Sequence, residues 1–365
     1  MDFSVVDKEL DAALEKGVFP GVAVLVGRDS GVLYRRAAGW RSLEPTRTPT
    51  YESVIYDVAS LTKPLATTVA LMLLVQAKEL RLDDYVARFF PNFGAHGKHV
   101  ITLRQLLSHS SGLAAWRHYY KGIDNLRDAR AYVYMQLLNE HLESPPGRKA
   151  VYSDLGFMLL GAVVEKVSGL NLDQYCQENI FHPLALHDTG FINLENRRWR
   201  GAKLQEEQFA PTECCPWRKR VLCAEVHDDN AYAMGGVAGH AGLFSTVDDL
   251  HRLVSCLIAC YQGACAFLSA TLLREFWMRD GRVADSTWAL GWDTPSARNS
   301  SAGTFFSPLS VGHLGFTGTS VWIDLEKNVH VIVLSNRVHP SRENEKIKAF
   351  RPALHNAVMQ AVFGK

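Results

Sequence analysis

A serine and a lysine three positions apart, in Ser60-Leu61-Thr62-Lys63, are the residues of this chain whose types and spacing best suit chemistry. Positions i and i+3 share one face of a helix, so the Lys63 amine can lie beside the Ser60 hydroxyl. A serine hydroxyl becomes a good nucleophile when a neighbouring base takes its proton. The spacing therefore indicates nucleophilic catalysis, although a surface lysine one turn after an N-cap serine produces the same pattern.

Ser-x-x-Lys alone has little specificity, because it is expected about once by chance in a chain of this length. Lys63 is the only lysine here that has a serine three places before it. The motif needs partners, and two segments offer them: Tyr152-Ser153-Asp154 in KAVYSDLGFMLLG and His313-Leu314-Gly315 in GHLGFTGTSVWID.

Helices are predicted to position these residues. The segment 63–80 is apolar at helical spacing. Pro64 is compatible with a helix only in its first turn, which puts Ser60 at the helix N-terminus, where unpaired N–H groups and the dipole favour developing negative charge. Further helices are expected over residues 5–17, 103–108, 126–139, 157–167, 246–261 and 344–363.

Strand signals occur near both ends of the chain. GVAVLVGR and GVLYRRAAG flank Asp29-Ser30-Gly31, and SVWIDL and HVIVLSNR flank Glu326-Lys327-Asn328, so each pair is expected to form a β-hairpin. HLGFTGT is expected to be a further strand. We therefore predict an α/β (α+β) fold in which an antiparallel sheet formed from both termini is flanked by helices.

The helical material between the strands predicts the domain organisation. Residues 1–65 and 241–365 would form the sheet domain, and residues 66–240 would be an inserted, mostly helical region. The active site is expected in the cleft between them. Residues 195–233 are polar and irregular, which indicates a loop insertion, and such long loops are often functional.

Composition excludes several classes of protein. The 365 residues carry a net charge of +1, which gives no footprint for nucleic acid or an anionic membrane. The N-terminus MDFSVVDKELDAALEKGVFPG has no signal-peptide pattern, and the apolar stretch 69–75 is too short to span a bilayer. We expect a cytoplasmic protein with no nucleic-acid or membrane partner, and the oligomeric state is left open.

Seven cysteines without regular spacing do not predict a disulfide framework. Two groups, Cys214-Cys215 with Cys223 and Cys256 with Cys260 and Cys265, raise the question of metal ligation. No C-x-x-C pair is present, and Cys256 and Cys260 fit the buried face of a helix. We therefore expect no metal and no cofactor. P-loop, G-x-G-x-x-G, H-E-x-x-H and G-x-S-x-G motifs are absent from the sequence.

Five segments in order, DVASLTKPLATT, LLSHSSGL, YSDLGFMLLGAVVEKVSG, HDDNAYAMGGVAGHAGLFST and GHLGFTGTSVWID, resemble the serine β-lactamase and penicillin-binding superfamily. The resemblance covers residues 15–360 and is strongest to the class C-like branch, which includes esterases and D-amino peptidases. It implies that Ser60 is the acylated nucleophile, that Lys63 eases removal of its proton, and that Tyr152 shuttles the proton to the leaving group.

The resemblance also implies the substrate-binding residues, which are Asp154, His313, Gly315, Phe316 and Thr317. The oxyanion hole would use the backbone N–H groups of Ser60 and Phe316. A tyrosine titrates near ~10 and acts as a base only where adjacent cations favour the phenolate. Whether the lysine or the tyrosine is the general base stays open, since the two can act as one coupled unit.

Two positions depart from the β-lactamase pattern. Asp154 stands where those enzymes have an asparagine, and an ionised carboxylate only accepts hydrogen bonds. It would repel a substrate carboxylate or favour an amine-bearing substrate. His313 stands where class C enzymes have a lysine, and the charge of a histidine depends on pH. Both changes disfavour efficient penicillin hydrolysis.

Other residues near these motifs are assigned structural roles. His109 in LLSHSSGL is expected to hydrogen-bond the neighbouring turn, and residues 227–229 are expected to order a loop beside the site. Trp288, Trp292 and Trp322 are expected in the core or in the walls of the pocket.

The prediction is a serine hydrolase that forms an acyl-enzyme and cleaves an ester or amide. Its partner would be a small-molecule ester, amide or peptide, such as a D-amino acid amide or a peptidoglycan-derived fragment. A β-lactamase or D-Ala-D-Ala peptidase is one alternative. A non-catalytic relative that binds peptides or cell-wall fragments is another, and the intact Ser60, Lys63 and Tyr152 disfavour it.

Overall fold

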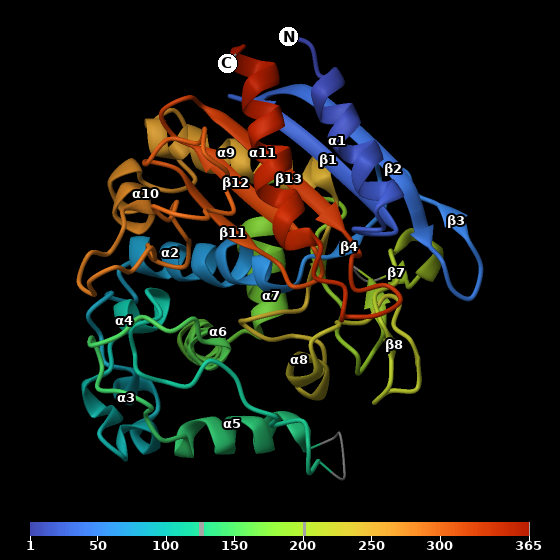
Figure 1. Ribbon diagram of the computed structural model, residues 1–365. Coiled ribbons are helices and arrows are strands. Elements are labelled where there is room, and N and C mark those ends of the chain that lie inside the picture. Colours follow the sequence, from blue (N-terminus) through green and yellow to red (C-terminus); the bar gives the residue numbers. More distant parts are fainter. Residues whose placement is uncertain (124–127, 200–201, 365) are drawn as a thin grey trace.

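A six-stranded antiparallel sheet lies at the centre of the computed structural model, which describes residues 1–123, 128–199 and 202–364. The strand order is β11-β12-β13-β1-β2-β3. Val22 of β1 lies opposite Ser335 of β13, so the two ends of the chain meet in the middle of the sheet (Figure 1). The predicted sheet from both termini is confirmed. Its strands are β1 (Gly21–Arg28), β2 (Gly31–Ser42), β3 (Thr48–Pro49), β11 (Val311–Leu314), β12 (Ser320–Asp324) and β13 (Val329–Ser335).

Both faces of this sheet are covered by helices. Successive side chains of a strand point to opposite faces, so alternate residues of β1 pack against different helices. Val22, Val24 and Val26 pack against α1 (Ser4–Glu15) and α11 (Ile347–Phe363), which lie side by side on one face (Figure 1). Ala23 and Leu25 pack into the core on the other face, toward α9 (Val247–Gln262). Seven of the eight residues of β1 are therefore buried.

The segments between the two halves of the sheet are mostly helical. The helices are α2 (Val69–Gln76), α3 (Val86–Phe89), α4 (Leu103–Leu107), α5 (Ala129–Asn139), α6 (Asp154–Ser168), α7 (Leu172–Cys176), α8 (Asp229–Ala233) and α10 (Ala270–Trp277). A small sheet joins β4 (Tyr56–Asp57), β10 (Leu243–Ser245) and β5 (Gly190–Phe191). Two short hairpins are β6 (Arg198–Trp199) with β7 (Ala202–Lys203) and β8 (Cys214–Cys215) with β9 (Arg220–Val221).

The structure differs from two of the elements predicted from the sequence. The predicted helix over 63–80 begins with a π-helical turn, Lys63–Thr68, and ends at Gln76. The predicted strand HLGFTGT ends at Leu314, because residues 315–319 form a tight turn closed by the Gly315 N–H donating to the Thr319 carbonyl at 2.8 Å. Residues 126–127 of the predicted helix 126–139 lie outside the described residues. The domain boundaries after residues 65 and 240 stay a prediction.

The apolar segment Ala59–Gln76 belongs to the core. With 18 residues and a mean hydropathy of 1.3 it is long and apolar enough to cross a membrane, yet 78% of it is buried inside the protein. It packs with α6, which is buried over most of its length. Burial against other helices explains its composition, since a helix that is hydrophobic all round belongs in a core or in a membrane.

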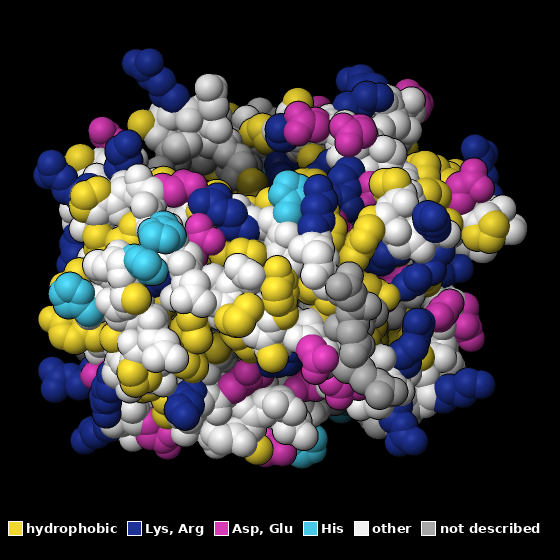
Figure 2. Space-filling view, turned by 90° about the horizontal axis from the view of Figure 1, so that it is seen from below, with side chains coloured by type: hydrophobic (Ala, Val, Ile, Leu, Met, Phe, Trp, Pro, Cys, Tyr) yellow, Lys and Arg dark blue, Asp and Glu magenta, His cyan; other side chains and the backbone are white. Residues whose placement is uncertain are grey.

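One face of the molecule shows how its charged side chains are arranged. The face seen from below carries basic and acidic side chains interspersed among hydrophobic ones (Figure 2). This distribution agrees with the net charge of +1.

Two glycines let α6 approach the segment that precedes β10. A Cβ added to Gly161 of α6 would lie 2.9 Å from the Gly239 Cα, and one added to Gly239 would lie 2.1 Å from the Phe157 carbonyl oxygen. The Gly239 carbonyl accepts a hydrogen bond from Thr67 at 2.7 Å. This contact therefore fixes the position of the next residue, His240.

We predict that Gly161→Ala lowers the free energy of unfolding by about 1–3 kcal/mol, because the methyl group must displace backbone atoms. Gly156→Ala in the same helix is the matched control, since its Cβ would meet its nearest neighbour at an ordinary 3.6 Å. Removing a helical glycine there should raise stability by up to about 1 kcal/mol. Urea unfolding followed by tryptophan fluorescence measures both, and effects of the same sign would contradict the prediction.

Candidate active site

Ser60 lies in a short 3-10 turn, Ala59–Leu61, directly after β4. Ala59 has a positive φ of 49°, which costs energy in a residue with a side chain. The buried Asp57 carboxylate holds this turn by accepting from the Ala59 N–H at 2.8 Å and from the His227 N–H at 2.7 Å. Burial raises the pKa of Asp57 even though these two hydrogen bonds lower it. Ser60, the predicted nucleophile, therefore lies on a strained turn fixed by an internal carboxylate.

Lys63 is fully buried, and its Nζ contacts three other groups of the site. It lies 3.0 Å from Ser60 Oγ, 3.0 Å from the His240 carbonyl oxygen and 2.6 Å from Asp154 Oδ1. Burial lowers the pKa of Lys63, but the Asp154 carboxylate and Tyr152 outweigh it and raise the pKa above its usual value. Lys63 is therefore an ammonium group at neutral pH.

Tyr152 lies beside this ammonium group at the start of α6. Its ring centroid is 4.8 Å from Lys63 Nζ. Ser153 caps α6 by accepting from the Gly156 N–H at 3.2 Å, so the turn holding Tyr152 is fixed. Burial raises the pKa of Tyr152, and the charge of Lys63 opposes this rise. The adjacent cation therefore makes the phenolate more accessible than burial alone would allow.

His109 packs against the Tyr152 ring and hydrogen-bonds the next residue, Ser153. Its Nδ1 accepts from the Ser153 N–H at 3.0 Å, and its ring lies 4.8 Å from that of Tyr152 and 4.4 Å from that of Trp288. Burial and the nearby Lys63 charge lower the pKa of His109 far below its usual value, so the ring is neutral. His109 is expected from the sequence to hydrogen-bond a neighbouring turn, and that turn is the one that contains Tyr152.

The end of β11 and the turn after it line the same cavity as Ser60. His313 Nδ1 donates to the Leu314 carbonyl at 2.8 Å, and burial and the Lys63 charge lower the pKa of His313 to about 3. The expected pH-dependent charge on His313 is therefore absent in the physiological range. Phe316 is half exposed, whereas Thr317 is fully buried and donates from Oγ1 to the Asp57 carbonyl at 2.7 Å.

A cavity of about 670 Å³ opens above Ser60. Among the described residues that line it are all the predicted site residues except Lys63, which is buried behind Ser60, and Thr317, which holds the turn. Sequence reasoning did not single out several of the other lining residues: Trp116, Asp293, Arg337, Arg342, Glu345, Ile347, Lys348 and Arg351. Most of them follow β13 in sequence.

Two of these arginines hold the 315–319 turn. Arg337 donates from Nε to the Phe316 carbonyl at 2.8 Å, and its guanidinium lies 4.4 Å from the Phe316 ring centroid. Arg351 donates from Nη2 to the Gly315 and Thr319 carbonyls at 2.8 and 2.7 Å. The only sequence signal for this role was a set of basic residues after the last strand.

The 195–233 segment reaches the cavity through residues 227–229. Asp228 Oδ1 caps α8 through the Ala231 N–H at 2.7 Å and accepts from His240 Nε2 at 2.9 Å. Burial would raise the pKa of Asp228, but His240 and the Ala231 N–H bring it well below its usual value. The expectation that these residues order a loop beside the site is confirmed.

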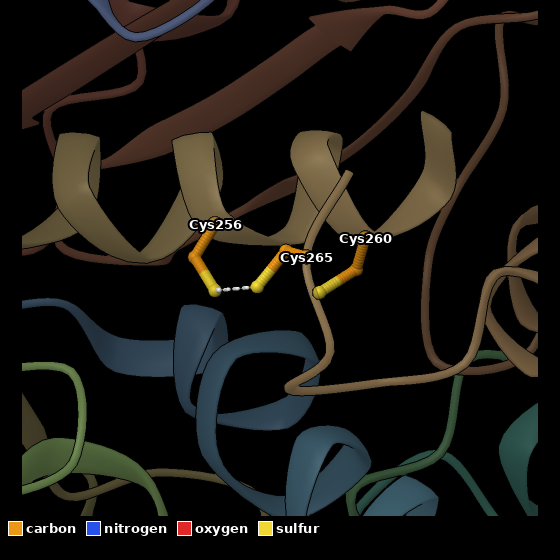
Figure 3. Close-up of side chains that lie close together, drawn as sticks. All are labelled: Cys256, Cys260 and Cys265. Carbon is orange, nitrogen blue, oxygen red and sulfur yellow. Dashed lines mark hydrogen bonds between the residues drawn. The ribbon is translucent and has the colours of Figure 1, made fainter. Parts of the chain in front are cut away.

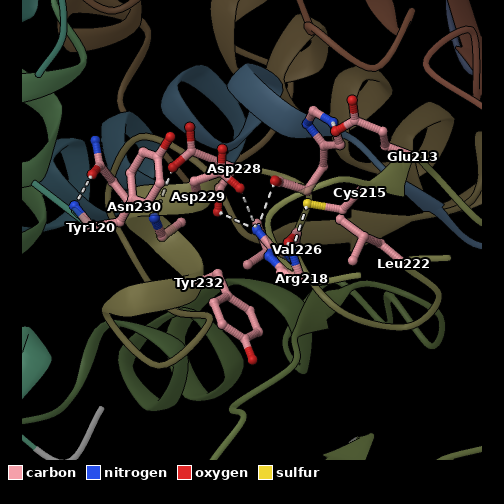
Figure 4. A network of polar contacts seen from close by, with 12 residues as sticks. Tyr120, Glu213, Cys215, Arg218, Leu222, Val226, Asp228, Asp229, Asn230 and Tyr232 are labelled. Atoms are coloured by element: carbon pink, nitrogen blue, oxygen red, sulfur yellow. Dashed lines mark hydrogen bonds and ion pairs between the residues drawn. The ribbon is translucent and has the colours of Figure 1, made fainter. Parts of the chain in front are cut away.

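Arg218, shown in Figure 4, and Arg342 both hydrogen-bond Asp229 of that loop. Arg218 is buried and donates to the Val226 carbonyl at 2.7 Å and to Asp229 Oδ1 at 3.0 Å. Arg342 donates from Nε to both Glu213 oxygens at 2.7 Å. Arginines therefore neutralise the carboxylates of Glu213 and Asp229, which disfavours their use as metal ligands.

The chain is similar to known proteins over most of its length. The family model described as Beta-lactamase matches residues 6–354. A protein of Escherichia coli (strain K12) named "Putative D-alanyl-D-alanine carboxypeptidase" is 33% identical over 354 residues, which are 88% of this chain and 79% of that protein. The N-acetylmuramyl-L-alanine amidase of Bacillus subtilis (strain 168) is 31% identical over 366 residues, 91% of this chain and 81% of that protein.

A solved structure shares the fold. EstCE1, described as a hydrolase with promiscuous acyltransferase activity, superposes with a TM-score of 0.73 at 22% identity and covers 96% of this chain and 98% of its own.

We predict that Asp154→Asn moves the alkaline limb of kcat/KM for ester hydrolysis to lower pH by about one unit or more. The substitution removes the charge that raises the pKa of Lys63, while the burial that lowers it remains. Asp293→Asn is the control, because Asp293 lines the same cavity without contacting Lys63. An unchanged limb in Asp154→Asn, or an equal shift in the control, would show that the ion pair does not set this pKa.

We also predict that Glu213 contributes to the free energy of unfolding and that this contribution is lost in acid. Burial would raise its pKa, but His227 and Arg342 lower it from 4.5 to about 2. A lowered carboxyl pKa stabilises the folded state above pH 4.5, and the contribution is lost as pH falls toward 2. Glu213→Gln should therefore cost about 3 kcal/mol at pH 7 and progressively less between pH 4.5 and 3.

The matched control is Glu206→Gln, an exposed partner of Arg197. Exposed ion pairs contribute little, so this variant should change stability by less than about 1 kcal/mol at every pH. Urea unfolding at pH 7, 4 and 3 compares the two. A pH-independent cost in Glu213→Gln would rule out the linkage.

Proposed function

The chain belongs to the Beta-lactamase family and is a serine hydrolase, and we propose that it acts through an acyl-enzyme formed on Ser60. The observation that carries this proposal is the 3.0 Å contact between Ser60 Oγ and the buried Lys63 Nζ at the base of the cavity. An ammonium group at this distance stabilises negative charge on the serine oxygen as its proton leaves.

The proposed reaction has two halves. Ser60 Oγ attacks the substrate carbonyl carbon, its proton passes through the Tyr152–Lys63 unit to the leaving group, and the bond to the leaving group breaks. Water then attacks the acyl-enzyme, gives its proton back through the same unit, and releases the acid. Because Lys63 is held as a cation by Asp154, we assign charge stabilisation to Lys63. Tyr152 carries the proton: its phenolate form, which the Lys63 charge favours, accepts the Ser60 proton, and the resulting phenol gives it to the leaving group.

The oxyanion hole is proposed to use the backbone N–H groups of Ser60 and Phe316. Both residues line the cavity, and their turns are fixed by Asp57 on one side and by Arg337 and Arg351 on the other. Rigid donors are effective because no reorganisation is needed as charge develops.

The proposed substrates are small esters, D-amino acid amides and peptidoglycan-derived fragments. A volume of about 670 Å³ is within the usual range for sites that bind small molecules. The ion pair with Lys63 balances the charge of Asp154, so the expected repulsion of a substrate carboxylate is weakened. The names of the relatives, which refer to D-alanyl-D-alanine and to N-acetylmuramyl-L-alanine, support an amide substrate.

A D-Ala-D-Ala carboxypeptidase is the second candidate. Arg337 lines the cavity and offers positive charge to a carboxylate, whereas Arg342 and Lys348, which also line it, already pair with Glu213 and Glu345. This possibility is favoured by the name of the Escherichia coli relative.

We predict that a fluorophosphonate probe labels the folded protein once, at Ser60, with the adduct located by peptide mass spectrometry. Ser60→Ala should lose the label, and its turnover of p-nitrophenyl esters should fall by about four orders of magnitude or more. Ser255→Ala, a change in α9 outside the cavity lining, is the control and should keep both. Labelling or full turnover in Ser60→Ala would refute the nucleophile.

Rate measurements on the wild-type protein distinguish the alternative activities. Rates with p-nitrophenyl butyrate, D-alanine p-nitroanilide, an acylated D-Ala-D-Ala peptide and nitrocefin separate the esterase, aminopeptidase, carboxypeptidase and β-lactamase alternatives. A labelled protein that turns over none of them has a reactive Ser60 but acts on another substrate. Absence of both labelling and turnover would favour the non-catalytic binding protein.

A further inference from the structure

Three cysteine side chains gather at the C-terminal end of α9, outside the residues that line the cavity. The sulfur atoms of Cys256, Cys260 and Cys265 all lie within 4.8 Å of one another (Figure 3). Two come from successive turns of the helix, because positions i and i+4 share a face. The third comes from the loop that follows the helix.

The loop is folded back to bring Cys265 onto the helix. Gly263 ends α9 with a left-handed φ of 82°, and the Ala264 N–H donates to the Ala259 carbonyl at 2.8 Å. Gln76 of α2 then fixes the loop, since its Nε2 donates to the Phe267 carbonyl at 3.1 Å and its Oε1 accepts from the Ser269 N–H at 2.7 Å. The approach of the third sulfur is thus built into the fold.

The spacing of the sulfurs suits ligands of one ion. Cys256 Sγ lies 3.7 Å from Cys265 Sγ. A tetrahedral zinc ion with Zn–S bonds of ~2.3 Å holds two thiolates roughly 3.8 Å apart, whereas a disulfide requires about 2.05 Å. The third sulfur needs to move by no more than about 1 Å to complete the set.

The cluster lies at the edge of the hydrophobic core, since Cys260 belongs to the core and Cys256 and Cys265 pack against it. Cys256 and Cys265 are partly exposed, which leaves a path for an ion, and Cys260 is buried. Cys260 Sγ already accepts a hydrogen bond from the Leu268 N–H at 3.4 Å, as ligating sulfurs do in metal sites. Cysteines that only fill space behave as small hydrophobic residues and are among the most buried.

We propose that Cys256, Cys260 and Cys265 bind one thiophilic metal ion of the zinc(II) or copper(I) class. Soft thiolate ligands select these ions. Binding releases the thiol protons to solvent and leaves a fourth position for water in the case of zinc. The bound ion fastens the 263–269 loop to α9. The proposal departs from the expectation that the chain binds no metal, which rested on the absence of a C-x-x-C pair and on the fit of Cys256 and Cys260 to a buried helix face.

Cobalt(II) is the probe, because tetrahedral thiolate coordination gives it an intense sulfur-to-metal charge-transfer absorption. The full-length protein is reduced with a phosphine, freed of metal with a chelator and titrated with CoCl₂. We expect the absorption to saturate at one equivalent and to disappear when zinc(II) is added. Cys256→Ser and Cys265→Ser should each lose it, whereas Cys214→Ser, an exposed cysteine outside the cluster, should keep it.

A thermal melt with and without zinc(II) gives an independent readout. The ion should raise Tm in wild type and in Cys214→Ser but not in Cys256→Ser. The proposal is overturned if the reduced wild-type protein shows no charge-transfer absorption, or if the absorption survives in Cys256→Ser. It is equally overturned if mass spectrometry finds a Cys256–Cys265 disulfide in the isolated protein and the reduced form takes up no metal.

Discussion

The buried ammonium group of Lys63 is the constraint on which the rest of the site depends. Moving a charge out of water costs several kcal/mol unless partners surround it. Here the partners are Ser60 Oγ, the Asp154 carboxylate and the His240 carbonyl, which come from three segments far apart in the chain. The fold must hold these segments together to keep the cation, and in doing so it places the Ser60 hydroxyl next to a positive charge.

That one charge sets the state of the groups around it. It opposes the burial that raises the pKa of Tyr152, and it adds to the burial that lowers the pKa values of His109 and His313. Both histidines are therefore neutral and serve as hydrogen-bonding groups. The ion pair compensates the charge of Asp154, so this departure from the β-lactamase pattern acts on Lys63.

The sheet explains how distant segments reach the site. Pairing of β1 with β13 joins the two ends of the chain, so the turn after β11 and the arginines after β13 meet the Ser60 turn. Close packing at Gly161 and Gly239 brings the His240 carbonyl to Lys63 from the opposite side. The cavity is therefore bounded by parts of the chain that share no local sequence pattern.

The sequence by itself determined the residue types and the local elements. Alternating strands at both ends predicted the sheet, and the Ser-x-x-Lys spacing with Pro64 after it put Ser60 at the start of a helical segment, because these features depend on neighbours within a few positions. Only the tertiary structure decided which distant groups meet: Asp154 with Lys63, Arg351 with the 315–319 turn, and Cys265 with Cys256. The physical reason is that charge compensation and ligand geometry act through space, over a few ångströms, between residues whose separation along the chain carries no periodic signal.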